Sequence, residues 1–322
     1  MTQALPGRRL GARSAIAVEV VAAVSSSASG PFGKALILSG WSAGGVLLVR
    51  TCLAALLLLP PAWWAARRHG TDLRRSLGGV TVLGVLGITG TVVCYYNALA
   101  RLPVGVAMML LYLSPVLVLG WVWIRHGERP AATTCLGAVV AIGGLVLVVA
   151  AMGVQRPSLS GIGWALGGAG CVATYFLTSD RMTASVPPVV LACAGLSVAS
   201  VSIGLLVAVG LLPFQAVGAA VDLGGWIVSP VLPLVLVVLL STVFVYVAGF
   251  AAVRVLGARM TSFVALAEPI AALGSAWLLL GEVPRPLQLT GAAFVVAGVV
   301  LIRSDRPIER SSRRRPPAPD RS

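Results

Sequence analysis

Four ionisable side chains lie inside long apolar stretches of this 322-residue chain: Glu19, Lys34, Arg50 and Glu268. An ionised group at the centre of a membrane helix costs about 2.5–3.5 kcal/mol on insertion scales, so such groups face a cavity or a partner. Pro269 follows Glu268 and lacks an N–H, so its helix can bend at this point. We expect Glu268 either to bind a proton or substrate, or to stabilise the bend through a hydrogen bond to a neighbouring helix.

Glu19 and Lys34 are fifteen positions apart, too far to pair with each other. Between them, Pro31 removes the helical partner of the Ser27 carbonyl in a stretch rich in serine and glycine. Openings of this kind bind polar substrates in transporters, although small residues also allow close helix packing. Lys34 is expected to bind an anion or to extend to the membrane interface. Glu19 is expected to carry a proton or to pair with an arginine.

Arg50 is expected to bind a carboxylate, which belongs either to a substrate or to a structural ion pair. Further hydrogen-bonding groups at membrane depth are Tyr96, Asn97 and Tyr175. Tyr96 could instead belong to the aromatic belt at the membrane interface. These residues complete the predicted set of substrate-binding or coupling groups.

The composition indicates the elements that position these side chains. Hydrophobic residues make up 58% of the chain and charged residues 11%, against about 45–50% and 25% in soluble domains, so a soluble globule is excluded. The mean hydropathy is +0.96. An all-α membrane protein with ten transmembrane helices is predicted, with spans near 14–38, 43–62, 76–100, 103–124, 132–152, 160–180, 189–212, 230–253, 259–280 and 287–303.

The first span also resembles a cleavable signal peptide, because arginines precede an apolar run that ends in small residues. Glu19 interrupts that run, so we interpret it as a membrane helix. Nineteen basic residues then fall on one side of the membrane and three on the other, which predicts a cytoplasmic-membrane protein with both termini in the cytoplasm. The segments 1–13 and 304–322 are expected to be cytoplasmic, the second as a disordered tail rich in arginine and proline.

An internal repeat appears when the chain is shifted by 154 residues, which superposes Pro115 on Pro269 and Glu128 on Glu282. It predicts two five-helix repeats, 14–152 and 160–303. Because five is odd, the second repeat enters the membrane inverted, as in alternating-access transporters with a substrate site near the midplane. We place that site between the first, second, third, sixth and ninth helices. Pro31, Pro115 and Pro269 are interpreted as helix kinks.

Glu128 and Glu282 each follow a glycine that can end a helix. Each precedes the next predicted helix, so a negative charge near that helix's N-terminus is their natural interpretation. Both are therefore expected to be structural.

These residues carry a resemblance to a known family. The chain resembles the EamA family of the drug/metabolite transporter superfamily over 14–303, and 241–242 and 258–259 are similar to its threonine/homoserine exporter branch. The first helix departs from many relatives because it lacks a Trp-Gly pair. The resemblance implies a role in substrate binding for the basic residue in the second helix. It rests on Ala-Leu-Ala-Arg-Leu-Pro at 98–103, Ser-Pro at 114–115, Gly-Glu-Arg-Pro at 127–130, Glu-Pro at 268–269 and Leu-Gly-Glu at 280–282.

We therefore expect a secondary transporter that exports a small polar metabolite, most simply an amino acid, with protons as the coupling ion. A zwitterion needs one anchor of each sign: Arg50 for the carboxylate, and Glu268 or the carbonyls near Ser27 for the ammonium. No ATP-binding loop occurs, so an ion gradient or the substrate gradient would drive transport. No nucleic acid, cofactor or metal is expected, and the protein is expected to be a monomer or a weak oligomer.

Two alternatives remain open. Efflux of a drug or hydrophobic cation would use several acidic residues in an aromatic-lined cavity, and this chain has two acidic residues in its spans. A membrane-embedded lipid-modifying enzyme would show clustered Asp, Glu or His at one membrane face. The sequence contains no such cluster, so we expect no enzymatic activity.

Overall fold

A computed structural model of the chain describes residues 11–69, 76–114, 132–150, 158–265 and 267–304. The first repeat contains α1 (Ala12–Ser27), α2 (Ser29–Leu38), α3 (Ala43–His69), α4 (Leu77–Val82), the π-helix η2 (Leu83–Gly90), α5 (Thr91–Leu99), α6 (Val104–Leu111) and α8 (Ala132–Ala150). The second contains α9 (Leu159–Thr183), α10 (Pro188–Ala208), α11 (Val231–Val238), the π-helix η3 (Leu239–Phe244), α12 (Val245–Val264), α13 (Ala267–Leu280) and α14 (Pro286–Ser304).

The helices are suited to a lipid environment. Five described stretches are long and apolar enough to cross a membrane, at 12–38, 43–68, 77–99, 188–208 and 231–257. Large apolar side chains such as Leu56, Val139 and Leu278 are exposed on the outside of the bundle. Lipid covers such side chains without the cost that water would impose. The predicted all-α architecture of ten helical spans is confirmed.

Several spans are interrupted, two of them close to the kinks predicted at Pro31 and Pro269. The first span breaks at Ala28, between α1 and α2, and the third and eighth spans each contain a π-helix. Gly257 has φ 76° and ψ 162°, a conformation that glycine adopts most easily, and it separates the eighth span from the ninth. Within the ninth span, α12 ends at Val264 and α13 begins at Ala267. These interruptions lie in helices that also build the interior of the protein.

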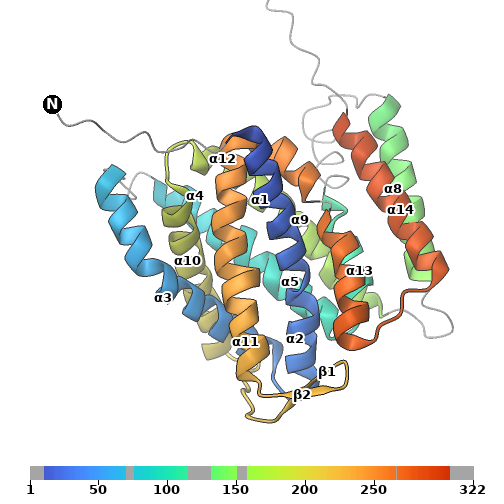
Figure 1. The fold of residues 1–322 in the computed structure, drawn as a ribbon, viewed down its shortest axis with the longest axis horizontal. Helices are drawn as coiled ribbons and strands as arrows, with labels where there is room; N and C mark the ends of the chain where they lie inside the picture. The colour runs from blue at the N-terminus through green and yellow to red at the C-terminus, as the bar shows by residue number, and fades with distance from the viewer. Residues whose placement is uncertain (1–10, 70–75, 115–131, 151–157, 266, 305–322) are drawn as a thin grey trace, which may run out of the picture.

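A small β-hairpin joins α10 to α11, which the sequence analysis did not anticipate. Its strands are β1 (Val221–Leu223) and β2 (Trp226–Val228), which pair antiparallel with Asp222 opposite Ile227. The Asp222 carboxylate accepts a hydrogen bond of 2.7 Å from the Gly225 N–H in the turn. The hairpin lies beside the end of α2 and marks one end of the bundle, which we call the hairpin end (Figure 1).

The packing follows the two-fold relation of the repeats. The second helix of each repeat pairs with its counterpart, α3 with α10, and the fifth helices pair likewise, α8 with α14 (Figure 1). Between these flanking pairs, α1 packs on α12 while α5 packs on α9, which are equivalent contacts when the repeats are exchanged. The two π-helices also correspond, because a shift of 154 residues carries 83–90 onto 237–244. The two repeats therefore share backbone irregularities as well as sequence.

Candidate functional site

Glu268 lies in the first turn of α13, beside the break in the ninth span. Its N–H donates to the Ala265 carbonyl at 3.0 Å, which supplies a partner for the carbonyl that Pro269 leaves without its usual one. The Ser26 hydroxyl of α1 donates to Oε1 at 2.6 Å, and the Tyr112 hydroxyl at the end of α6 donates to Oε2. Both carboxylate oxygens are thus bound by neutral hydroxyls from the first repeat.

Glu19 lies on α1, and only 6% of its surface is exposed. Its Oε2 atom has no hydrogen-bond partner among the described residues. The predicted alternative of a pairing with an arginine is not found in the part of the chain that the structure describes. A buried carboxylate oxygen without a donor is costly, so this atom is available to a ligand or proton.

Glu19 and Glu268 line the same cavity, whose volume is about 140 Å³. Its walls come from both repeats: α1, η2, α5, the end of α6, α9, α12 and α13. Four aromatic side chains contribute, and none of the described lining residues is basic. The polar and aromatic lining residues are Glu19, Ser26, Thr91, Tyr112, Tyr175, Phe176, Tyr246, Thr261 and Glu268.

The cavity is lined by some, but not all, of the helices between which the sequence analysis placed the site. The first, third, sixth and ninth helices line the cavity, and Tyr175 lies in its wall as a hydrogen-bonding group at membrane depth. The second helix is not among the described lining elements, while the fourth contributes Tyr112 and the eighth contributes Tyr246. The difference arises because α3 lies at the flank of the bundle, against α10 (Figure 1).

Arg50 forms a separate cluster with Tyr96. Only 4% of the Arg50 surface is exposed, and its Nη1 donates to the Ser29 hydroxyl and to the Tyr96 hydroxyl, each at 2.9 Å. Gly33 on α2 leaves room for the Tyr96 ring to lie against the backbone of this helix, because a Cβ at position 33 would lie 2.5 Å from the Tyr96 hydroxyl oxygen. The carboxylate partner expected for Arg50 is replaced by two hydroxyls, and neither Arg50 nor Tyr96 is among the described residues that line the cavity.

Two further predicted site residues are bound within the protein. The Ser27 carbonyl, which Pro31 leaves without a helical partner, accepts a hydrogen bond of 3.2 Å from the Ser275 hydroxyl of α13. Asn97 donates from Nδ2 to the Val93 carbonyl of its own helix at 2.9 Å. The Ser27 carbonyl, freed by Pro31, therefore forms a hydrogen bond between the two repeats. Asn97 lies outside the described lining of the cavity.

At the hairpin end, Lys34 forms an ion pair of 2.6 Å with Glu282. The other Glu282 oxygen accepts a hydrogen bond of 3.1 Å from the Val104 N–H at the start of α6, where a negative charge is favoured. The prediction for Glu282 is wrong in one respect, since the helix terminus it binds is that of α6 and not that of the next helix, α14. The inverted packing brings α6 beside the end of α13.

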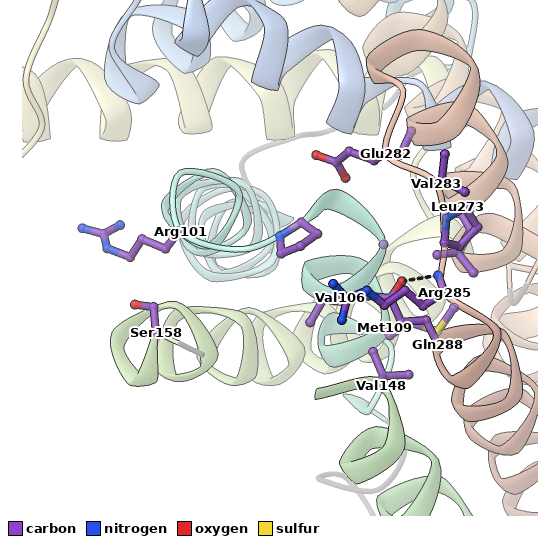
Figure 2. A pocket seen from close by; sticks show the side chains of 14 residues that line it. Arg101, Val106, Met109, Val148, Ser158, Leu273, Glu282, Val283, Arg285 and Gln288 are labelled. Carbon is purple, nitrogen blue, oxygen red and sulfur yellow. Dashed lines mark hydrogen bonds between the residues drawn. The ribbon is translucent and has the colours of Figure 1, made fainter. Parts of the chain in front are cut away.

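Glu282 also borders a second pocket of about 360 Å³, between α6, α13 and the start of α14 (Figure 2). Gln288 accepts the Arg285 backbone N–H at 2.9 Å in its wall, and Arg101 points away from its centre. Glu128 and Pro115, which the repeat relates to Glu282 and Pro269, lie outside the described residues, as do residues 305–322 of the tail.

Several cavity residues were missed by the sequence analysis. Ser26 was passed over in favour of its neighbour Ser27, and Thr91, Tyr112 and Tyr246 were not proposed. The internal repeat could have pointed to Tyr112, because a shift of 154 residues carries Tyr112 to position 266, two residues before Glu268. No comparable signal marks Tyr246, since its place in the cavity depends on how α12 packs against α1.

Comparisons with known proteins agree with this architecture. Residues 13–150 and 159–304 each match the model of the EamA-like transporter family. The chain is 29% identical over 268 residues to the probable terminal-alkyne amino-acid exporter of Streptantibioticus cattleyicolor, covering 82% of this chain and 85% of that protein. It is also 29% identical over 225 residues to the threonine/homoserine exporter RhtA of Escherichia coli K12, covering 69% and 66%.

The fold is shared with a protein of known crystal structure. The two superpose with a TM-score of 0.59 at 19% sequence identity, covering 90% of this chain and 96% of the other. At this identity the likeness concerns the fold alone.

Proposed function

Because the chain belongs to the EamA-like transporter family, and is therefore a non-enzymatic multi-pass membrane protein, we propose that it exports a small amino acid through the cavity around Glu19 and Glu268. The observation that carries this proposal is the cavity itself, which lies between the repeats and is lined by acidic and hydroxyl groups from both. Substrate sites of inverted-repeat transporters lie at such interfaces. The similarity to two amino-acid exporters supports the choice of substrate.

The size of the cavity supports a small substrate. Its volume of about 140 Å³ is well below the roughly 300–1,000 Å³ typical of sites for drug-sized ligands. Purified protein in liposomes loaded with labelled threonine, homoserine or alanine should release the amino acid faster than protein-free liposomes. Equal release from both would contradict the proposal.

We further propose an orientation in the cytoplasmic membrane with both termini inside and the hairpin end outside. The distribution of nineteen against three basic residues supports it. In a cysteine-free background, single cysteines at Gly40 or Asp222 should react with an impermeant thiol reagent added outside, whereas one at Arg68 should not. Labelling at Arg68 from outside would reverse the orientation.

Proton coupling is the third part of the proposal. Two carboxyl groups in one cavity can bind protons and substrate alternately. Inward movement of protons is then linked to outward movement of the substrate. An imposed pH gradient should accelerate amino-acid release from the liposomes, and an uncoupler should remove the acceleration. Release that ignores both treatments would refute the coupling.

A second candidate function is efflux of an organic cation. The observation that favours it is the combination of two carboxyl groups with Tyr112, Tyr175, Phe176 and Tyr246 around one cavity. Cations are attracted to aromatic faces as well as to carboxylates. Export of a quaternary ammonium dye without export of any amino acid would support this function over the first.

A further inference from the structure

We propose that the cavity recognises its substrate through an ammonium group bound at Glu19, and that the substrate's carboxylate is dispensable for binding. This inference rests on the proposed function, since it names the group of the amino acid that the site recognises. It differs from the sequence-based expectation, in which Arg50 binds the carboxylate and Glu268 or the Ser27 carbonyl binds the ammonium.

The two carboxyl groups of the cavity differ in their hydrogen-bond partners. Glu268 already accepts hydrogen bonds on both oxygens, from Ser26 and Tyr112. Glu19 is 94% buried, and its Oε2 atom has no partner among the described residues. An ammonium group, with three N–H donors, satisfies that oxygen without disturbing the contacts of Glu268. Glu19 is therefore the ligand, and Glu268 a neighbouring charge that also favours a cation.

Aromatic side chains form part of the cavity wall that Glu19 also lines. Tyr175 contacts Phe176 with ring centroids 5.3 Å apart and Tyr246 with ring centroids 6.1 Å apart, and all three line the cavity. A carboxylate beside aromatic faces favours an organic ammonium, because the ring quadrupole attracts the cation and its apolar substituents pack on the rings. The same faces would repel an anionic group.

The described lining of the cavity offers no basic residue to a substrate carboxylate. Arg50 Nη1 donates to Ser29 and Tyr96, and its buried Nε atom has no partner among the described residues, but Arg50 lies outside the described lining of the cavity. Lys34 is engaged by Glu282 and the Leu102 carbonyl. None of the described residues that line the cavity is basic. Thr91 has a buried hydroxyl without a partner among the described residues, and this hydroxyl can donate one neutral hydrogen bond. Loss of the substrate's carboxylate should therefore cost little affinity.

Gly249 offers a way to test the site without removing a charge. It lies on α12, and a Cβ at this position would stand 3.9 Å from Glu19 Oε2 and 3.6 Å from the Tyr175 hydroxyl. Alanine therefore fits without a clash but occupies the space next to the unpartnered oxygen. Gly163 on α9 is the matched control, because a Cβ there meets nothing within 4 Å.

The experiment measures binding to purified full-length protein with three probes. L-threonine carries both charges, L-threoninamide keeps the ammonium without the carboxylate, and N-acetyl-L-threonine keeps the carboxylate without the ammonium. Isothermal titration should give threoninamide an affinity within about threefold of threonine or better. N-acetylthreonine should bind at least tenfold more weakly. Competition with labelled threonine in liposomes should give the same order.

The variants test the assignment of Glu19. E19Q should weaken both ammonium-bearing probes at least tenfold, and G249A should weaken them while G163A binds as the wild type does. G249A retains the carboxylate, so it remains informative even where E19Q lowers the yield of folded protein. Each preparation is compared by gel filtration and thermal unfolding, so that loss of binding is separated from loss of fold.

The outcomes separate this inference from the amino-acid proposal. Threonine transport that E19Q leaves unchanged, or N-acetylthreonine binding as tightly as threonine, would overturn the inference and leave the proposed function intact. Binding of threoninamide but no transport of any amino acid would support the ammonium site and overturn the proposed substrate. Absence of binding for all three probes, with G249A and wild type alike, would overturn both.

Discussion

The two ends of α13 carry two carboxylates that make similar connections with opposite electrostatic results. At one end Glu268 joins α1 and the end of α6, through Ser26 and Tyr112. At the other end, the hairpin end, Glu282 joins α2 and the start of α6, through Lys34 and the Val104 N–H. One 14-residue helix of the second repeat is thus held at both ends against the first and fourth spans of the first repeat.

The difference lies in what neutralises the charge. Glu282 is paired with an ammonium group and lies at a helix N-terminus, so its negative charge is compensated. Glu268 is bound by hydroxyls alone, and Glu19 adds a second carboxyl with an unpartnered oxygen in the same cavity. The protein forms its own ion pair at the hairpin end, whereas the two carboxyl groups of the cavity have no basic partner among the described lining residues. We therefore propose that Glu282 has a structural role and that Glu19 and Glu268 belong to the transport site.

The largest expected effect comes from exchanging a carboxylate for an amide at each end. E268Q should reduce the initial rate of transport by about 10–100-fold, because hydrogen bonds to a charged group contribute about 1.5–3 kcal/mol. E282Q should retain most of the rate, since glutamine still accepts the Val104 N–H. Rates are measured in liposomes at equal protein content. Equal losses in the two variants would erase the distinction between the ends.

Arg50 provides a third buried charge for the comparison, and like Glu268 it is bound by neutral hydroxyls. R50Q should lower the free energy of unfolding by about 2–3 kcal/mol, because Ser29 and Tyr96 lose charge-assisted hydrogen bonds in a buried setting. The fraction that remains folded should still bind threonine, in contrast to E19Q. Thermal unfolding in detergent and titration of the folded fraction test both statements. A stable R50Q that no longer binds would instead assign Arg50 to the substrate site.

A smaller effect is expected from the ion pair at the hairpin end. The side chains of Lys34 and Glu282 are 19% and 26% exposed, so a double-mutant cycle of K34M and E282Q should give a coupling of about 1 kcal/mol. The coupling should fall as salt concentration rises. A value near 3–5 kcal/mol would show that the pair behaves as a fully buried one and would remove its contrast with a surface contact.

The smallest effect is expected in the middle of α13. S275A removes the hydroxyl that donates to the Ser27 carbonyl and should cost about 0.5–1.5 kcal/mol of stability without changing the transport rate. G274A is its neighbouring control, because a Cβ at Gly274 meets nothing within 4 Å. A large loss of transport in S275A would extend the functional region beyond the end that carries Glu268.

Much of the fold could be predicted because membranes impose a strong constraint on sequence. A backbone in hydrocarbon must satisfy its own hydrogen bonds, so each apolar stretch of adequate length becomes a helix. The matched Pro and Glu residues 154 positions apart were enough to predict two inverted repeats. The π-helices and the break at Gly257 were not predicted, because helix interruptions depend on packing against neighbouring spans as well as on local sequence.

The candidate site shows the same division at the level of single side chains. The sequence by itself determined that Glu19, Arg50 and Glu268 must lie in the protein interior, because lipid does not tolerate their charges. The tertiary structure alone decided which hydrogen-bond partners these side chains have. Arg50 donates to the hydroxyls of Ser29 and Tyr96, and Glu268 accepts from those of Ser26 and Tyr112. Neither Glu19 Oε2 nor Arg50 Nε has a hydrogen-bond partner within the described ranges of the chain. Partners more than 200 residues apart, such as Ser26 and Glu268, are brought together by the packing of one repeat on the other, which local sequence patterns do not encode.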